Sequence, residues 1–178
     1  MTPNHVTVHS DGICIYLVIE VRNALLPKIF LLLCNALALG AIITVCVMGV
    51  AIVGLVALLL EMVLLKYTLW NFFGRELVTV NTRVLTYQHD YGLFKTKLVT
   101  HKVNRMLHCQ AFSTIKEKEG TWQYLQFGSY DENDLPSLLY QVSLPVEEKD
   151  TLLIQQLIDK LYVTRLAEEQ MISVLHLN

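Results

Sequence analysis

The longest apolar segment of the chain covers residues 24–73, and within it residues 29–60 include no charged side chain. A membrane-spanning helix needs about 20 predominantly apolar residues. As one helix, a segment of 50 residues would be about 75 Å long, against a hydrocarbon core of about 30 Å. The pattern therefore predicts two spans, and one bent span over 29–60 is the competing interpretation.

The two predicted spans are a helix over about 26–46 and a second over about 50–72. We expect the turn at Val47–Val50, where Gly49 can take the backbone angles of a reversal. Both polar parts of the chain then lie on the same side of the membrane. We therefore expect a membrane α-helical hairpin over 24–73.

Runs of strand-like sequence stand on either side of this segment. Residues 5–20 read HVTVHSDGICIYLVIE, in which Asp11-Gly12 is a strong hairpin signal between two β-rich runs. After the anchor, ELVTVNTRVLTYQHD predicts two strands separated by a polar break. Further strands are predicted at Lys95–Thr100, Arg105–Ile115 and Thr121–Phe127, with a solvated turn over 116–120.

The period changes near the C-terminus. From Pro145, apolar residues recur at helical spacing, acidic residues occupy the first turns, and Ser143 is the predicted cap. We expect this helix either to continue through Leu175 or to break near Glu168. Residues 129–142 are predicted to be an acidic connection that includes at most a helical turn.

These elements predict an α+β class beside the membrane hairpin: a small antiparallel β domain closed by a C-terminal helix. The expected organisation is an N-terminal β-hairpin of the polar domain over 1–23, the transmembrane hairpin over 24–73, and the remaining β domain with its helix over 74–178.

Composition agrees with a membrane anchor. Hydrophobic residues make up 53% of the 178 residues and charged residues only 17%, below the roughly one quarter of soluble domains. The mean hydropathy is +0.43. This composition argues against a disordered tail, a disulfide-stapled miniprotein and a strongly basic nucleic-acid binder.

Charge is unevenly distributed, although the net charge is only −2. Residues 1–65 carry −1, residues 66–118 carry +6 and residues 119–178 carry −7. The open end of the predicted hairpin is flanked by Arg22, Lys28, Lys66 and Arg75, and its closed end has no charge. The positive-inside tendency then predicts that both termini are cytoplasmic.

Small residues suggest how the two helices pack. Ala36, Gly40 and Thr44 recur every four residues, and Gly54 and Ala57 on the second helix can face them. Such stripes allow close approach of membrane helices. The alternative is that small residues are simply common in membrane helices.

Glu61 and Asn35 are the polar residues inside the predicted spans that we single out. With the turn centred near residue 48, the two lie at similar depth on opposite helices. A charged side chain at a helix centre costs about 2.5–3.5 kcal/mol on insertion scales. We expect an intramembrane polar contact of Glu61 with Asn35 or with another chain. The alternative is that Glu61 reaches the headgroups near Lys66.

A lipid-facing set of residues is predicted at the polar end of the hairpin and in the strands that follow. Anionic headgroups attract Lys and Arg by about 1 kcal/mol each near the surface, and aromatic residues favour the interface. The alternative is that the basic residues are ordinary solvated side chains. The set is Lys66, Trp70, Arg75, Lys95, Lys97, Lys102 and Arg105.

No pattern in the sequence points to catalysis, a cofactor or a metal. The four cysteines form no CxxC pair, and His5 and His9 lack a third ligand. Nucleophile-elbow, Walker and dinucleotide signatures are absent. We therefore expect a non-enzymatic protein with no cofactor.

The segments LWNFFGRELVTV and LTYQHDYGLF, together with Phe127-Gly128, are similar to motifs of a known group. Over about residues 5–165 the chain resembles uncharacterised bacterial membrane proteins with a pleckstrin-homology-like domain. The resemblance implies a PH-like β domain split by the hairpin and held at the cytoplasmic face of the bacterial inner membrane. The chain departs from that pattern in its acidic stretch after Phe127-Gly128, its longer C-terminus and Glu61.

The resulting expectation is a scaffold or accessory subunit of a larger membrane complex, in contact with lipids and with other membrane protein subunits. A homo-oligomer is compatible with this interpretation, and a nucleic-acid partner is not expected. The alternatives are an anionic-lipid-sensing module and a small oligomeric transporter that uses Glu61.

Overall fold

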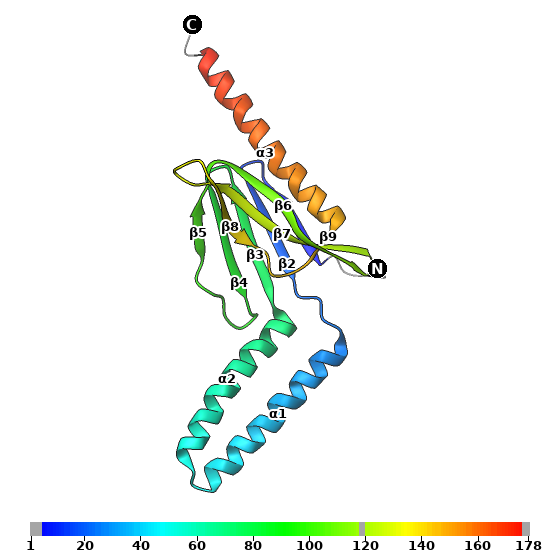
Figure 1. Ribbon diagram of the computed structural model, residues 1–178, viewed down its shortest axis with the longest axis vertical. Helices are drawn as coiled ribbons and strands as arrows, with labels where there is room; N and C mark the ends of the chain where they lie inside the picture. The colour runs from blue at the N-terminus through cyan, green and yellow to red at the C-terminus, as the bar shows by residue number, and fades with distance from the viewer. Residues whose placement is uncertain (1–4, 118–119, 176–178) are drawn as a thin grey trace. The chain divides into compact units, whose positions relative to one another are not determined.

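A computed structural model describes residues 5–117 and 120–175 of the chain (Figure 1). Contacts divide it into two compact units. The β unit comprises Met1–Ile19, Glu76–Gln88 and Lys97–Asn178, and the anchor unit comprises Glu20–Arg75 and His89–Thr96.

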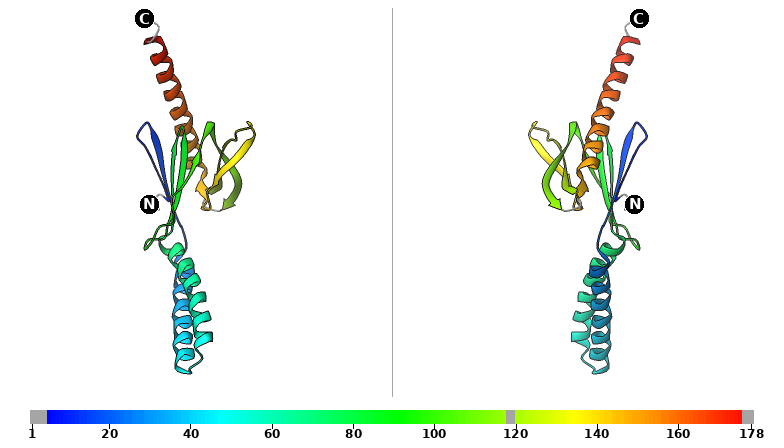
Figure 2. Two further views of the ribbon diagram at one scale, coloured as in Figure 1. Left: turned by 90° about the vertical axis from the view of Figure 1, so that its left-hand side faces the viewer. Right: turned by 90° about the vertical axis from the view of Figure 1, so that its right-hand side faces the viewer.

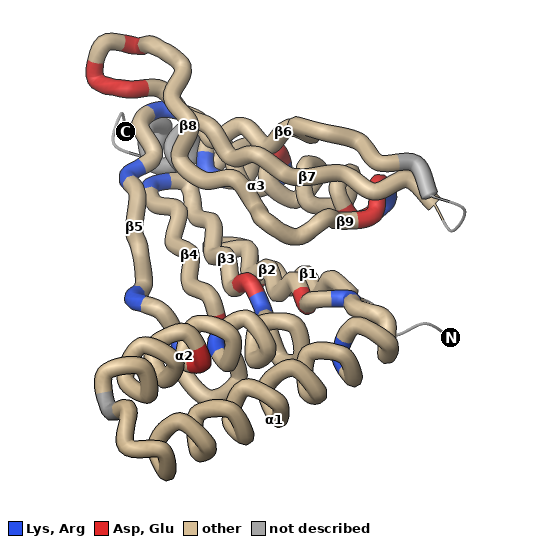
Figure 3. Tube along the Cα trace, turned by 60° about the horizontal axis from the view of Figure 1, so that its bottom comes forward, with Lys and Arg blue, Asp and Glu red and all other residues tan. Residues whose placement is uncertain are grey.

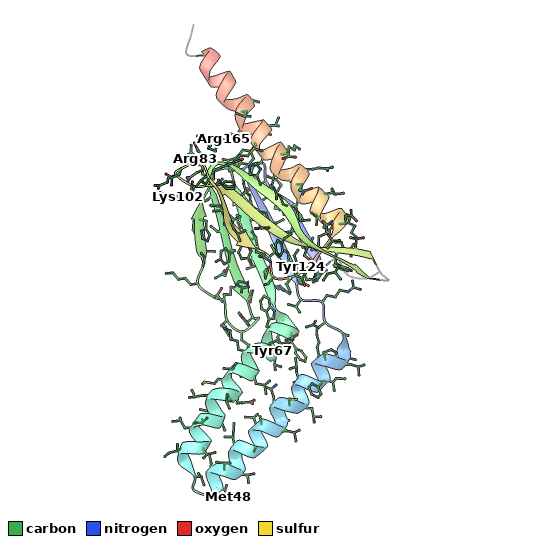
Figure 4. The ribbon with its side chains drawn as sticks, viewed as in Figure 1. Met48, Tyr67, Arg83, Lys102, Tyr124 and Arg165 are labelled. Carbon is green, nitrogen blue, oxygen red and sulfur yellow. The ribbon has the colours of Figure 1, made fainter. Side chains whose placement is uncertain are left out.

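The anchor unit contains two helices of 23 residues each, α1 (Leu25–Val47) and α2 (Ala51–Phe73). They are joined by a short turn in which Gly49 has φ +78°, a conformation that glycine adopts readily. The prediction of two helices is confirmed, and the single bent span over 29–60 is wrong. Figure 4 labels Met48 at this turn.

The β unit begins with an antiparallel hairpin of β1 (Val6–Ser10) and β2 (Cys14–Glu20), as the Asp-Gly signal predicted. Gly12 takes φ +86°, and the Asp11 carboxylate accepts the backbone N–H groups of Ile13 (2.9 Å) and Cys14 (2.6 Å). These hydrogen bonds lower the pKa of Asp11.

Two sheets and a helix complete the polar part of the chain (Figures 1 and 2). The first sheet has the order β1-β2-β3-β4-β5, and the second has β6-β7-β8, with β9 paired to β7. The hairpin of the anchor unit is thus inserted in the chain between two neighbouring strands, β2 and β3. The remaining elements are β3 (Arg75–Asn81), β4 (Val84–Asp90), β5 (Val99–Lys102), β6 (Asn104–Glu117), β7 (Gly120–Tyr130), β8 (Pro136–Gln141), β9 (Val146–Glu147) and α3 (Glu148–Leu175).

The core of the β unit draws alternate residues from both sheets and one face of α3. The α3 residues Ile154, Ile158, Leu161 and Tyr162 are buried, and the Leu107 N–H donates to the Tyr162 hydroxyl at 2.9 Å. The strand residues that fill this core are Ile15, Leu17, Ile19, Val78, Val80, Leu85, Leu107, Leu125 and Phe127.

Three predictions along the second half of the chain are wrong in detail. Residues 129–142 contain strand β8 rather than only a connection, because Tyr140 and Val142 alternate into the core. The helix begins at Glu148 rather than near Pro145, since the buried Val146 pairs with β7. The strand expected at Lys95–Thr100 is β5, which begins four residues later and ends two residues later.

Two further expectations have clear outcomes. α3 is continuous through Leu175 with no break near Glu168. The turn expected over 116–120 is wrong at its described positions, because β6 continues through Glu117 and β7 begins at Gly120, its pairing partner; residues 118–119 lie outside the described residues.

Glu76 is fully buried and joins β3 to the segment between β8 and β9. Its carboxyl oxygens accept the Ser143 N–H at 3.1 and 3.2 Å, and they also accept the Ser143 hydroxyl. Burial raises the pKa of Tyr140, and the nearby charge of Glu76 raises it further. The Tyr140 side chain is also hydrogen-bonded to Glu76. Ser143 therefore binds Glu76 and does not cap the helix.

Replacing Glu76 should destabilise the β unit, because Glu76→Ala leaves the Ser143 N–H and hydroxyl and the buried Tyr140 side chain without this partner. We expect a loss of about 2–3 kcal/mol in the free energy of unfolding, and a smaller loss for Glu76→Gln. Denaturation of the full chain in detergent, followed by the fluorescence of the buried Trp122, measures it. The exposed Glu132→Ala is the control, and equal stability of Glu76→Ala and this control contradicts the assignment.

Candidate functional site

The outer surface of α1 and α2 is almost wholly apolar. Large side chains such as Leu26 (79% exposed) and Ile52 (81% exposed) point away from the helix pair along its length. Both helices are long and apolar enough to cross a membrane, and each is about 34 Å long at 1.5 Å per residue. Contiguous apolar surface on this scale marks a membrane or protein contact.

The inner surface of the pair follows a regular spacing. The least exposed positions alternate steps of three and four residues along each helix, the pattern of a packed antiparallel helix pair. We call these residues the seam. They are Leu31, Asn35, Ala38, Ile42 and Val45 on α1, and Gly54, Ala57, Glu61, Leu64, Thr68 and Asn71 on α2.

The predicted small-residue stripe does not belong to the seam. Ala36, Gly40 and Thr44 are exposed, and a Cβ added at Gly40 would meet nothing within 4 Å. The expectation that this stripe packs on α2 is wrong. Successive residues are about 100° apart around a helix, so a stripe that begins at Ala36 lies on a different face from the one that carries Asn35 and Ile42. Gly54 does lie in the seam, where an added Cβ would approach Cys46 Sγ to 3.1 Å.

Polar side chains tie the two helices together near their open end. The Asn35 amide donates to the Thr68 hydroxyl across the seam at 2.8 Å and to the Leu31 carbonyl at 2.6 Å. Thr68 in turn donates to the carbonyl of Leu64 at 2.9 Å. Nearer the end of α2, the Asn23 amide donates to the Asn71 side-chain oxygen.

Glu61 lies in the seam, 8% exposed, and its Oε2 accepts no hydrogen bond within the described chain. Asn35 is hydrogen-bonded to Thr68 instead, and its own Oδ1 is also buried without a donor. The expected Asn35–Glu61 pair is therefore not formed, because Thr68 is seven residues, about 10 Å, further along α2 than Glu61. Contact of Glu61 with another chain stays a prediction.

Lys66 does not pair with Glu61 either. Its Nζ lies 5.5 Å from the centre of the Tyr91 ring, in the loop that joins β4 to β5. Trp70 also packs on this loop, with ring centres 5.1 Å from Tyr91 and 5.5 Å from His89. The loop thus belongs to the anchor unit although it follows α2 by some 15 residues.

The predicted lipid-facing residues fall into two groups. Arg75 and Lys95, with Lys66 and Trp70, belong to the anchor unit, where Arg75 pairs with Glu20 (3.1 Å) and Lys95 with Asp90 (3.5 Å). Lys97, Lys102 and Arg105 belong to the β unit and are exposed. Figure 3 marks the positions of the Lys and Arg residues in blue, and those of the Asp and Glu residues in red, along the Cα trace.

Within the β unit, Arg83 and Lys102 lie at one end of the first sheet, whereas Lys97 precedes the opposite end of β5. Lys102 pairs with Val84, the residue after Arg83, and Figure 4 labels both side chains there. Arg105 has φ +66° and binds Asp134 with a separation of 2.5 Å. Arg105 therefore has an ion-pair partner within the β unit, although both side chains stay largely exposed, and its contact with lipid stays a prediction.

The chemistry of the described residues offers no metal centre. No group of three His, Cys, Asp or Glu in ranges 5–117 and 120–175 is placed to hold an ion. The cysteines are free thiols, and burial raises the pKa of Cys109 to about 12, which keeps it a thiol at neutral pH.

Comparisons with protein-family models, with curated proteins and with solved structures gave no match.

Thr68→Val should weaken the helix pair, since it removes the hydroxyl that accepts the Asn35 amide. Interhelical hydrogen bonds in membranes contribute about 0.6 kcal/mol on average and up to about 1.7 kcal/mol, so we expect a loss in this range. Steric trapping of the helix pair in bicelles measures the free energy. Thr44→Val is the matched control, because the Thr44 hydroxyl bonds only the Gly40 carbonyl of its own helix. Equal losses for the two variants contradict the role of the seam.

Proposed function

We propose that the chain is a non-enzymatic integral membrane protein that serves as a scaffold or accessory subunit of a larger membrane complex. The observation that carries this proposal is the apolar outer surface of two antiparallel helices of 23 residues. Such a surface is compatible with water only when a bilayer or other membrane helices cover it.

The β unit is the interaction domain of this protein, and we propose a PH-like fold for it. Two antiparallel sheets and a C-terminal helix support that assignment, as does the place of the helical hairpin between β2 and β3. The motifs LWNFFGRELVTV and LTYQHDYGLF, which resemble those of bacterial PH-like membrane proteins, are the reason to choose this fold. A PH-like domain would work by binding rather than by catalysis.

The proposed location is the bacterial cytoplasmic membrane, with both termini in the cytoplasm. α1 and α2 are antiparallel, so the chain enters and leaves the anchor at one end. That end carries Arg22, Lys28, Lys66 and Arg75, whereas the turn at Met48–Val50 has no charge. The positive-inside tendency favours this orientation.

The partner of this protein is proposed to be another membrane protein, and two features support that. Glu61 has a buried oxygen without a donor, which costs several kcal/mol in lipid unless something else supplies one. α3 presents Val163 (65% exposed) and Leu166 (58% exposed), and in Figures 1 and 2 its C-terminal half extends past the sheets.

Lipid sensing is the second candidate function. The exposed Lys97 and Lys102 of the β unit and the exposed Lys66 of the anchor unit support it. These residues would attract anionic headgroups.

Extraction of the protein from native membranes, followed by mass determination of the particle, tests the proposal. We expect a defined hetero-complex, because both candidate contacts need a partner. Glu61→Leu should release the chain from it and Glu61→Gln should not, since an amide still offers polar groups to the partner. The double variant Val163→Asp, Leu166→Asp should also release it, with the exposed Thr164→Asp as control.

The outcomes separate the candidate functions. A homo-oligomer favours transport through Glu61, and a lone lipid-bound monomer favours lipid sensing. A complex that persists in all four variants contradicts the proposed contacts.

A further inference from the structure

The loop between β4 and β5 exposes apolar side chains at its tip. Leu93 is 79% exposed and Phe94 is 44% exposed, and they are followed directly by Lys95. A surface turn in water usually carries polar residues at such positions, because nothing there compensates for apolar exposure. An apolar tip beside a cationic side chain is suited to the boundary between lipid headgroups and acyl chains.

The loop is held in a defined conformation. The Tyr91 N–H donates to the Phe94 carbonyl at 2.9 Å, and the Gly92 N–H donates to Asp90 Oδ1 at 2.8 Å. At its base, the Thr96 N–H donates to the His89 carbonyl at 2.9 Å. These bonds close a tight turn whose tip is Leu93 and Phe94.

Gly92 allows this turn to approach α2 closely. Its φ is +83°, and an added Cβ would lie only 2.7 Å from Phe73 Cβ. Trp70 packs on Tyr91, and the Tyr91 and Phe94 rings stack with centres 4.7 Å apart. The loop and the last turns of α2 therefore form one packed cluster within the anchor unit.

The position of this cluster along α2 sets its depth. Tyr91 lies beside Lys66 and Trp70, which precede the end of α2 at Phe73 by seven and three residues, or about 10 and 5 Å. α2 is about 34 Å long, and the hydrocarbon core is about 30 Å thick, with headgroup layers beyond it. When the core is centred on α2, it ends about 2 Å before Phe73, so Tyr91 falls just inside the edge of the core, next to the headgroup layer.

We propose that the β4–β5 loop is a third membrane contact, in addition to the two spans. Leu93 and Phe94 enter the boundary between headgroups and acyl chains. Lys66 faces lipid phosphates, and so does Lys95, whose side chain is 54% exposed beside its ion-pair partner Asp90. The occupant of this surface is the bilayer in which the hairpin itself is anchored, so the inference rests on the proposed function. The loop would fix the rotation of the helix pair about its axis, because only one side of α2 carries it.

A depth measurement on the full chain tests this contact. Leu93→Cys is labelled with the environment-sensitive fluorophore NBD, in a chain whose Cys14, Cys34, Cys46 and Cys109 are replaced by Ala. The protein is placed in phosphatidylcholine nanodiscs that contain nitroxide lipids labelled at the headgroup, the upper acyl chain or the chain end. Leu39→Cys, at the middle of α1 and 50% exposed, is the control for insertion of the hairpin.

The label at residue 93 should be quenched by the headgroup and upper-chain nitroxides roughly twofold more than by the chain-end nitroxide, as interfacial insertion requires. Quenching of residue 39 but not of residue 93, with residue 93 open to aqueous iodide, overturns the loop contact and leaves the anchor standing. Absence of nitroxide quenching at both residues overturns the anchor itself.

One further measurement separates apolar insertion from charge attraction. Adding phosphatidylglycerol to the nanodiscs should increase headgroup quenching at residue 93, and Lys66→Gln with Lys95→Gln should abolish that increase while the basal quenching stays. Loss of all quenching in the glutamine variant contradicts insertion driven by Leu93 and Phe94.

Discussion

The large apolar surface of α1 and α2, which is unfavourable in water, is the constraint on which the rest of this structure depends. α1 and α2 cover Asn35, Glu61, Thr68 and Asn71 in the seam and leave most of their large aliphatic side chains outside. In a hydrocarbon layer every backbone group must be satisfied within its own helix, and two 23-residue helices meet that requirement. The insertion of this pair between β2 and β3 joins a domain with its own hydrophobic core to two helices that are long and apolar enough to cross a membrane.

The polarity of the seam gives the anchor its specificity. In lipid, apolar contact alone does not drive helices together, so hydrogen bonds and close packing set their register. The Asn35–Thr68 bond fixes the register near the open end, and Gly54 allows close approach near the turn. Glu61 is the exception, a buried carboxyl group with an unused oxygen, and such exceptions in membrane segments usually mark function.

Much of this architecture follows from sequence periodicity, because period and length are local signals. The two helices, the Asp-Gly hairpin and the C-terminal helix were predicted from them. The pairing of Asn35 with Thr68 was not, since a turn centre near residue 48 fixes helix register only to within a few residues. The small-residue stripe failed for a related reason: sequence spacing places residues on a shared face but does not say which face is turned inward.

Other features depend on contacts between residues distant in the chain. Glu76 and Ser143 are 67 residues apart, and no local pattern connects a strand glutamate with a residue that looks like a helix cap. The β4–β5 loop joins the anchor unit through Trp70 and Phe73. In the sequence, the apolar pair Leu93 and Phe94 within a polar turn was the available sign of this contact. It indicates that the loop has an apolar surface, but it does not say what covers that surface.

The central claim is that the two helices cross the membrane as a hairpin, with both ends of the chain in one compartment. Single cysteines placed at residue 2 and residue 178 of the intact protein, probed on whole cells with a membrane-impermeant maleimide, test it most directly. The account predicts that both stay unlabelled until the cells are permeabilised and that both then react. Labelling of one terminus but not the other in intact cells would contradict it.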